Sequence, residues 1–227
     1  MRNAMQPVYV FQMGKVGSTS LVEAVDGIQV HHLHWGNWWR SLRAEYCRHH
    51  LNSLRMKLDR PTRIITAVRE PVARNISAFM QNHRAYGWQP TMETFLERFR
   101  HEEPLAWFDE EMLPFSGIDV FKHPFPHDKG WQVIDDRLLI LRAETDDSIK
   151  QEVISNFLGQ PVNLVRKNVS KDKQYAHSYK SLRNEAPPIA YVDKMLESGF
   201  TRHFYSEAEI ANFRSYWASR IEAGRNG

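Results

Sequence analysis

Short apolar runs alternate along this chain with longer stretches in which apolar residues recur at helical spacing. Three runs cover 8–11, 64–68 and 138–141, and a weaker one covers 28–33. Near-continuous apolar runs of this length are typical of strands buried on both faces of a parallel sheet. Strands that alternate with helices predict βαβ units. We therefore expect an α/β fold of three layers, α/β/α, around a central and mostly parallel sheet.

The stretches between the runs predict helices. One helix follows the first run, and another begins at Pro71, a residue that suits the first turn of a helix. A third covers 92–99, and a fourth covers 149–158 and stops at Gly159. A capping box, Ser206-Glu-Ala-Glu209, predicts the start of a last helix.

Two segments, residues 101–131 and 163–188, lack this periodicity, and we expect them to form irregular loops that bind ligand. The chain shows no internal repeat and no linker, so we expect a single domain over residues 1–227. With 42% hydrophobic and 25% charged residues, the composition is that of an ordinary globular protein.

Charge and cysteine content narrow the class of protein. The formal net charge of +3 favours an anionic ligand but is too weak to indicate nucleic acid. Cys47 is the only cysteine, which excludes an intramolecular disulfide and zinc sites built on several cysteines. No apolar run is long enough to cross a bilayer, and no signal peptide is evident. We expect a cytoplasmic protein without a membrane span, and the oligomeric state stays open.

The segment behind the first apolar run carries the clearest chemical signal. It reads Gly14-Lys-Val-Gly-Ser-Thr-Ser20 and leads into the first predicted helix. Glycines let a backbone turn tightly and approach an anion, and helix amino termini attract phosphate. Lys15 adds a mobile positive charge, and Ser18, Thr19 and Ser20 add hydroxyl donors. The pattern predicts a P-loop-like site for a phosphorylated nucleotide.

The order of residues in this loop differs from that of an ATP-binding loop. A Walker A motif has its lysine directly after the last glycine, whereas Lys15 precedes Gly17. A nucleotide kinase or related phosphotransferase that uses ATP and magnesium therefore remains only an alternative. A further alternative is a module without catalytic activity that binds polyanions through a basic surface.

A second signal follows the run at 64–68. Arg69 stands at the carboxyl end of this predicted strand, where open α/β sheets bind ligands, and Ser77 follows eight residues later. An arginine and a hydroxyl that converge on one point suit a phosphate group. Arg74 lies between them, and two interpretations stay open for it: contact with the same phosphate, or an ion pair with an acid on its own helix.

These two motifs, in this order, resemble the sulfotransferases that use 3′-phosphoadenosine-5′-phosphosulfate (PAPS). The family's first motif, a strand followed by Lys-x-Gly-[Ser/Thr]-[Ser/Thr], is similar to Lys15-Val-Gly-Ser-Thr19. Its second, a strand followed by Arg-[Asp/Glu]-Pro-x₃-Arg-x₂-Ser, is similar to Arg69 through Ser77. Leu141-Arg-Ala-Glu144 and the basic segment 166–173 resemble later family features. The nearest likeness is to members that act on carbohydrates, among them glycosaminoglycan 2-O-sulfotransferases and capsular-polysaccharide types.

The resemblance implies transfer of a sulfuryl group from PAPS to a hydroxyl, or alternatively an amine, of an acceptor that we expect to be a carbohydrate. We expect no metal ion, since no carboxylate cluster for magnesium is evident in the sequence. The first motif would hold the 5′-phosphosulfate and the second the 3′-phosphate, with Lys15 also stabilising the leaving group. The residues expected to bind PAPS are Lys15, Val16, Gly17, Ser18, Thr19, Ser20, Arg69, Arg74, Ser77, Lys171 and Lys173.

A general base is expected to take the proton of the acceptor. The resemblance to 2-O-sulfotransferases favours His32 or His34, which would share one face of an extended segment. Glutamates serve in other branches, so Glu70 and the acids at 109–111 stay open. Each histidine also has an ordinary alternative as a polar loop residue.

Overall fold

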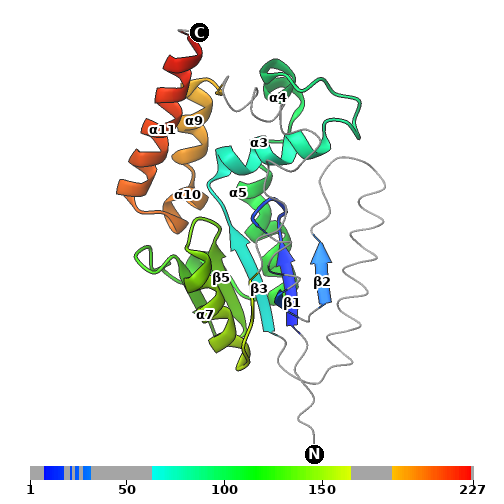
Figure 1. Ribbon diagram of the computed structural model, residues 1–227, viewed down its shortest axis with the longest axis vertical. Helices are drawn as coiled ribbons and strands as arrows, with labels where there is room; N and C mark the ends of the chain where they lie inside the picture. The colour runs from blue at the N-terminus through cyan, green and yellow to red at the C-terminus, as the bar shows by residue number, and fades with distance from the viewer. Residues whose placement is uncertain are drawn as a thin grey trace, which may run out of the picture. The chain divides into compact units, whose positions relative to one another are not determined.

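A computed structural model of the chain is shown in Figure 1. It divides into two compact units, the first of residues 1–68 and 106–165 and the second of 69–105 and 166–227. The expectation that the whole chain acts as one domain remains a prediction. The residues that the structure describes are 8–17, 21, 24, 25, 28–31, 63–164 and 186–225.

The first unit contains a five-stranded sheet in the order β2-β1-β3-β5-β4. β1 pairs in parallel with both β2 and β3, and β3 pairs in parallel with β5, whereas β4 runs antiparallel to β5. The four expected strands and the α/β class are therefore confirmed. The strands are β1 (Val8–Gln12), β2 (Ile28–His31), β3 (Arg63–Val68), β4 (Trp131–Ile134) and β5 (Leu138–Arg142).

Strand β4 was not expected from the sequence. Three of its four residues are only partly buried, so it has no continuous apolar run. A tight turn joins it to β5: Asp135 and Asp136 have left-handed φ angles of 52° and 51°, and Arg137 N donates to Ile134 O at 3.0 Å. Left-handed turns of this kind match the twist of a hairpin. The edge strand is therefore specified by its turn more than by its own residues.

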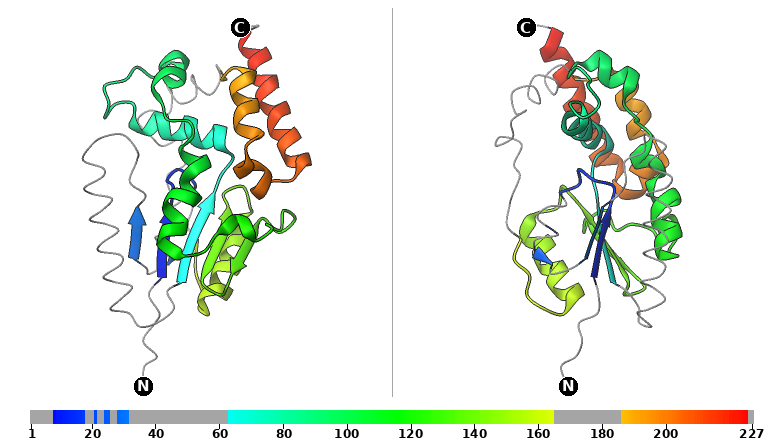
Figure 2. Two further views of the ribbon diagram at one scale, coloured as in Figure 1. Left: turned by 180° about the vertical axis from the view of Figure 1, so that it is seen from behind. Right: turned by 90° about the vertical axis from the view of Figure 1, so that its right-hand side faces the viewer.

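Helices lie on both faces of this sheet (Figure 2, right). Tyr9 and Phe11 point to the face that carries Trp107 and Phe115, with Phe11 4.5 Å from Phe115 between ring centroids. On the opposite face, Arg63 of β3 lies over the ring of Phe157 in α7 (Asp147–Leu158). The expected stop of α7 at Gly159 is confirmed by a left-handed φ of 71°. Three complete layers over the whole chain remain a prediction.

The segment 101–131 is largely helical, so the expectation of an irregular loop was wrong. It contains short helical turns, and Trp107, Phe108 and Met112 are buried in them. Short turns of differing pitch broke the regular spacing on which helix prediction depends. The turns are α5 (Glu103–Trp107), the π-helical η1 (Phe108–Met112), α6 (Leu113–Ser116) and the 3₁₀-helical η2 (Val120–Lys122).

The second unit is helical within its described residues. Pro71 starts α3 as expected, and the capping box is confirmed, since Ser206 N donates to Glu209 Oε2 at 2.9 Å. Buried side chains such as Phe79, Phe95 and Trp217 form its core. The helices are α3 (Pro71–Asn82), α4 (Met92–Arg98), α9 (Ile189–Leu196), α10 (Gly199–Phe204) and α11 (Glu207–Arg225), of which α9 and α10 were not expected.

Candidate functional site

The loop behind β1 turns through an unusual backbone conformation. Gly14, Lys15 and Gly17 have φ angles of 74°, 64° and 86°. A lysine rarely adopts a left-handed conformation, because its Cβ crowds the backbone, so the surrounding structure holds it there. Val16 is buried and anchors the loop, whereas the Lys15 side chain is partly exposed. Loops that contain left-handed residues are a source of concave anion sites in proteins.

The position of this loop in the sheet is that of a ligand site in open α/β folds. From β1 the chain leads to β2 on one side, and from β3 it leads on to β5 on the other side. Strand order therefore reverses between β1 and β3, and their carboxyl ends form the topological switch point. The loop at 13–17 starts at this point, and β3 ends at Val68, the residue before Arg69.

Several predicted site residues lie outside the described residues. They comprise three hydroxyl residues of the phosphate loop, both histidines proposed as base and two lysines of the basic segment. These assignments stay predictions: Ser18, Thr19, Ser20, His32, His34, Lys171 and Lys173.

The amino terminus of α3 is capped by Glu70. Its two carboxylate oxygens accept hydrogen bonds from Val72 N at 2.8 Å and from Ala73 N at 2.7 Å. Pro71 has no N–H, so the first turn of the helix has its donors satisfied. Glu70 is 3% exposed and is occupied by this cap, which argues against its alternative assignment as a base. The backbone N–H groups of this first turn are therefore already engaged and do not form an anion site.

Arg69 and Ser77 are both partly exposed, so each can reach a ligand in solution. Ser77 lies on the less buried stripe of α3 that also carries Ala73 and Gln81, one turn away on either side. Their assignment to a 3′-phosphate stays a prediction.

Arg74 has an environment of its own. Its side chain is fully buried, and its Nη2 lies 3.2 Å from Oε1 of Glu103, which is also buried. Its Nη1 donates to Asn75 Oδ1 at 3.0 Å. Of the two interpretations given from the sequence, the structure shows an ion pair, although the acid belongs to α5 and not to α3. Contact of Arg74 with a phosphate stays a prediction.

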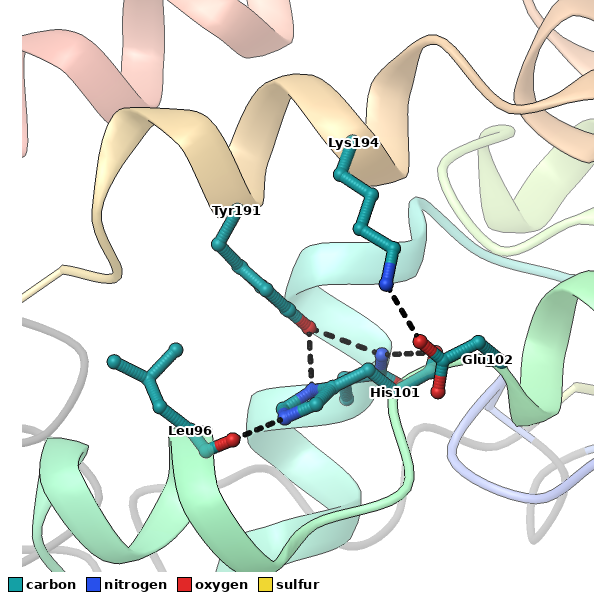
Figure 3. Close-up of polar contacts among 6 residues, drawn as sticks. Leu96, His101, Glu102, Tyr191 and Lys194 are labelled. Atoms are coloured by element: carbon teal, nitrogen blue, oxygen red, sulfur yellow. Dashed lines mark hydrogen bonds and ion pairs between the residues drawn. The ribbon is translucent and has the colours of Figure 1, made fainter.

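A hydrogen-bonded network joins α3, α9 and the segment after α4 (Figure 3). Asn75 Nδ2 donates to the Tyr191 hydroxyl at 3.1 Å and to the His101 carbonyl oxygen at 2.9 Å. The hydroxyl lies 3.0 Å from His101 Nδ1, and His101 Nε2 lies 3.3 Å from the Leu96 carbonyl oxygen. Both ring nitrogens of His101 are therefore engaged, which suits a structural role better than that of a base.

The electrostatics of this network agree with neutral partners. Burial lowers the pKa of His101 and raises the pKa of Tyr191, so both side chains stay uncharged near neutral pH. An exposed ion pair flanks them, with Lys194 Nζ 2.7 Å from Glu102 Oε1, and this lysine lowers the pKa of Glu102. Nothing in the sequence pattern marked Asn75, His101 or Tyr191 as a connected set.

The remaining candidates occupy structural or exposed positions. Arg142 is buried at the end of β5 and donates to the His127 carbonyl oxygen at 2.9 Å, so it braces the segment before β4. Asp109 and Glu110 are exposed on η1. Within the described ranges, no three histidine, cysteine or acidic side chains cluster as a metal site would require. None of the helices in those ranges has the length and apolar character needed to cross a membrane.

Comparison with known proteins decides the family. The sequence model of the NKWYS family, described as "Putative capsular polysaccharide synthesis protein", matches residues 92–206, about half of the chain. The chain belongs to the NKWYS family. No curated protein and no solved structure gave a match.

The segment shared with the NKWYS family runs from α4 to the end of α10. It includes His101, Tyr191 and Arg142, and it leaves out the loop at 13–17 and Arg69. The family match and the two motifs predicted to bind phosphate thus lie largely in different parts of the chain.

Proposed function

We propose that this protein transfers a sulfuryl group from PAPS to a hydroxyl of a carbohydrate acceptor, with an amine as the alternative acceptor. The observation that carries the proposal is the loop at 13–17. It joins a lysine to left-handed glycines at the carboxyl end of β1, beside the switch point of the sheet. The match to a polysaccharide synthesis family supports a carbohydrate as the acceptor.

The proposed reaction is an in-line displacement. A lone pair of the acceptor oxygen forms a bond to sulfur while the bond from sulfur to the bridging phosphate oxygen breaks. The electron pair of the broken bond stays on 3′-phosphoadenosine-5′-phosphate (PAP), and the acceptor proton passes to a base. Such transfers need little covalent help from the protein, so positioning and charge stabilisation supply most of the rate.

In this proposal, different residues of the chain stabilise charge, bind the nucleotide and take the acceptor proton. Lys15 would neutralise the negative charge that grows on the leaving phosphate, and the backbone near Gly17 would bind the same group. A Cβ at Gly17 would meet no atom of the described residues within 4 Å. Arg69 and Ser77 would bind the 3′-phosphate, which separates PAPS from ordinary nucleotides. His32 or His34 would take the acceptor proton.

Titration calorimetry with PAP, and with AMP as the matched control, tests this proposal. PAP should bind at least about tenfold more tightly than AMP, because only PAP carries the 3′-phosphate. Equal affinity would remove the basis for the assignment of Arg69 and Ser77. Binding of ATP that requires magnesium would instead favour a phosphotransferase, and binding that collapses with salt for every polyanion would favour a non-catalytic module.

A further inference from the structure

Gln12 is a buried amide without a hydrogen-bond partner. It is the last residue of β1, and its residue surface is 1% exposed. In the part of the chain that the structure describes, neither its Nε2 nor its Oε1 has a partner. Each such group has given up its hydration without a replacement, which destabilises the folded protein. A buried amide in this state calls for a specific explanation.

The location of Gln12 distinguishes it from other unpartnered groups of the sheet. Within the described residues, the Tyr9 hydroxyl, the Thr66 hydroxyl and Gln132 Oε1 are also buried without partners, but all three residues lie before the ends of their strands. Gln12 stands at the carboxyl end of β1, beside the switch point and two residues before Gly14. Phe11 points to the face of the sheet that carries Trp107, so Gln12, next along the strand, belongs to the opposite face.

The chemistry of an amide limits the partner that Gln12 can accept. Nε2 can only donate hydrogen bonds, and Oε1 can only accept them. An anion would accept a hydrogen bond from Nε2 but leave Oε1 unpaired. A single hydroxyl group would pair with one end of the amide and leave the other end unpaired. A sulfuryl oxygen next to an attacking hydroxyl offers an acceptor and a donor side by side. That pair of groups comes together only when the donor nucleotide and the acceptor are both bound.

We propose that Gln12 positions the two reacting groups, with Nε2 donating to a sulfuryl oxygen of PAPS and Oε1 accepting from the acceptor hydroxyl. This inference rests on the proposed function, because it places the sulfuryl group at the loop at 13–17. It adds a residue that neither phosphate motif contains. It also explains why the protein retains a buried amide that its own fold does not satisfy.

The substitution Gln12→Met tests the contact with PAPS, since methionine keeps the length of the side chain and removes both polar atoms. Calorimetry should show PAP affinity within about twofold of the unaltered protein and PAPS affinity lowered about tenfold, because only PAPS carries the sulfuryl group. Equal losses for both nucleotides, or no loss for either, would overturn the inference. If the unaltered protein binds neither nucleotide, the proposed function fails instead, which is a different result.

The stability of the same variant provides a second readout. Gln12→Met should raise the urea midpoint, because an apolar side chain replaces groups that have no partner. Gln132 on β4, at the far edge of the sheet, supplies a control of the same residue type: its Nε2 donates to the Pro124 carbonyl oxygen at 3.1 Å, and its Oε1 has no partner within the described residues. Gln132→Met should leave both nucleotide affinities unchanged. A lowered midpoint for Gln12→Met would show that the fold itself uses the amide, and would overturn the inference.

Discussion

Tyr191 on α9 accepts a hydrogen bond from Asn75 on α3, with 3.1 Å between Oη and Nδ2, although 116 residues separate them in the chain. Because Asn75 donates to the hydroxyl, the hydroxyl proton can go to His101 Nδ1, and His101 Nε2 can donate to Leu96 O. This order satisfies every group and assigns His101 the neutral Nε2–H form. The helices are therefore joined by a closed set of polar contacts inside an apolar core.

Removal of the Tyr191 hydroxyl should destabilise the protein. Tyr191→Phe keeps the ring but leaves Asn75 Nδ2 and His101 Nδ1 without their shared partner. We expect the free energy of unfolding to fall by about 1–3 kcal/mol, measured by urea denaturation. Tyr86→Phe is the control, because Tyr86 is 41% exposed and its stacking on Trp88 survives the change. Equal urea midpoints for the two variants would contradict a buried, satisfied network.

His101 should make stability depend on pH. Burial lowers its pKa below 6.5 in the folded protein, so the unfolded chain binds the proton first as the pH falls. Stability should therefore be complete above pH 6.5 and decline as the pH drops from there toward the folded-state pKa. Glu102 acts in a separate window, because its lowered pKa adds stability that is lost only below 4.5.

Urea denaturation at about pH 7.5 and about pH 5.5 measures the contribution of His101. The midpoint of the unaltered protein should drop at the lower pH. In His101→Gln that part of the drop should disappear, whatever the variant's stability at neutral pH. A pH dependence that is identical in the two proteins would assign it to other histidines.

Two glycines with the same backbone conformation should respond differently to alanine. Gly117 and Gly130 both have φ of 72°, so both substitutions carry the left-handed penalty of about 1 kcal/mol. A Cβ at Gly117 would meet nothing within 4 Å, whereas one at Gly130 would lie 2.5 Å from Thr145 Oγ1. Thr145 cannot easily move away, because its hydroxyl donates to the Gly130 carbonyl oxygen at 3.1 Å.

We therefore expect Gly130→Ala to lose about 1–3 kcal/mol more of the free energy of unfolding than Gly117→Ala. Thermal and urea unfolding of both variants measure the difference. If both variants lose the same amount, the segment before β4 yields to the added methyl group, and Arg142 and Thr145 do not hold it rigidly.

The ion pair between Arg74 and Glu103 should matter more for stability than for nucleotide binding. Arg74→Met leaves the carboxylate of Glu103 buried without its cation, at a cost of about 3–5 kcal/mol in the free energy of unfolding. The double variant with Glu103→Met should recover part of this loss, because no unpaired charge remains. If the Arg74→Met variant folds but binds PAP much more weakly, that result would instead support a contact of Arg74 with the 3′-phosphate.

Substitutions in the two motifs that are predicted to bind phosphate should have different effects on turnover and on nucleotide affinity. Under the proposed function, Lys15→Ala should lower the turnover of PAPS about 100-fold or more with little change in PAP affinity, because the lysine would act on charge that develops during transfer. Arg69→Ala should mainly weaken PAP binding, because the 3′-phosphate does not take part in bond breaking. Single-turnover assays and calorimetry separate the two effects. The reverse pattern would mean that the two roles are exchanged.

The sequence was most informative where one physical signal acted alone. Continuous apolar runs identified β1, β3 and β5, and Pro71, Gly159 and the Ser206–Glu209 box marked helix ends, because caps depend on residues a few positions apart. β4 escaped prediction because its residues are mostly half-buried and the turn at Asp135 and Asp136 depends on left-handed backbone angles that the apolar pattern does not record. The short turns in 103–116 escaped because their pitch changes every few residues.

The candidate site was predictable only at its motifs. The glycines of the loop at 13–17 predicted a tight turn. The left-handed backbone of Lys15 and the burial of Gln12 depend on tertiary packing, which a local sequence pattern does not record. Glu70 was left open as a base from the sequence, and in the structure it caps α3. The sequence could not separate these roles, because a carboxylate suits both helix capping and acid–base chemistry. The network at Tyr191 joins residues too distant in sequence for any spacing rule.

The division of the chain into two interleaved units has a consequence for dissection. Each unit is assembled from two separate stretches, so the polypeptide passes from one to the other after residues 68, 105 and 165. No single proteolytic cut and no simple truncation can release either unit as an intact piece. The segment 92–206 that matches the family model likewise takes in fragments of both, and expressed by itself it would lack β1, β3 and all of α11. Fragment studies of this protein will need circular permutation or co-expressed pieces in place of deletion series.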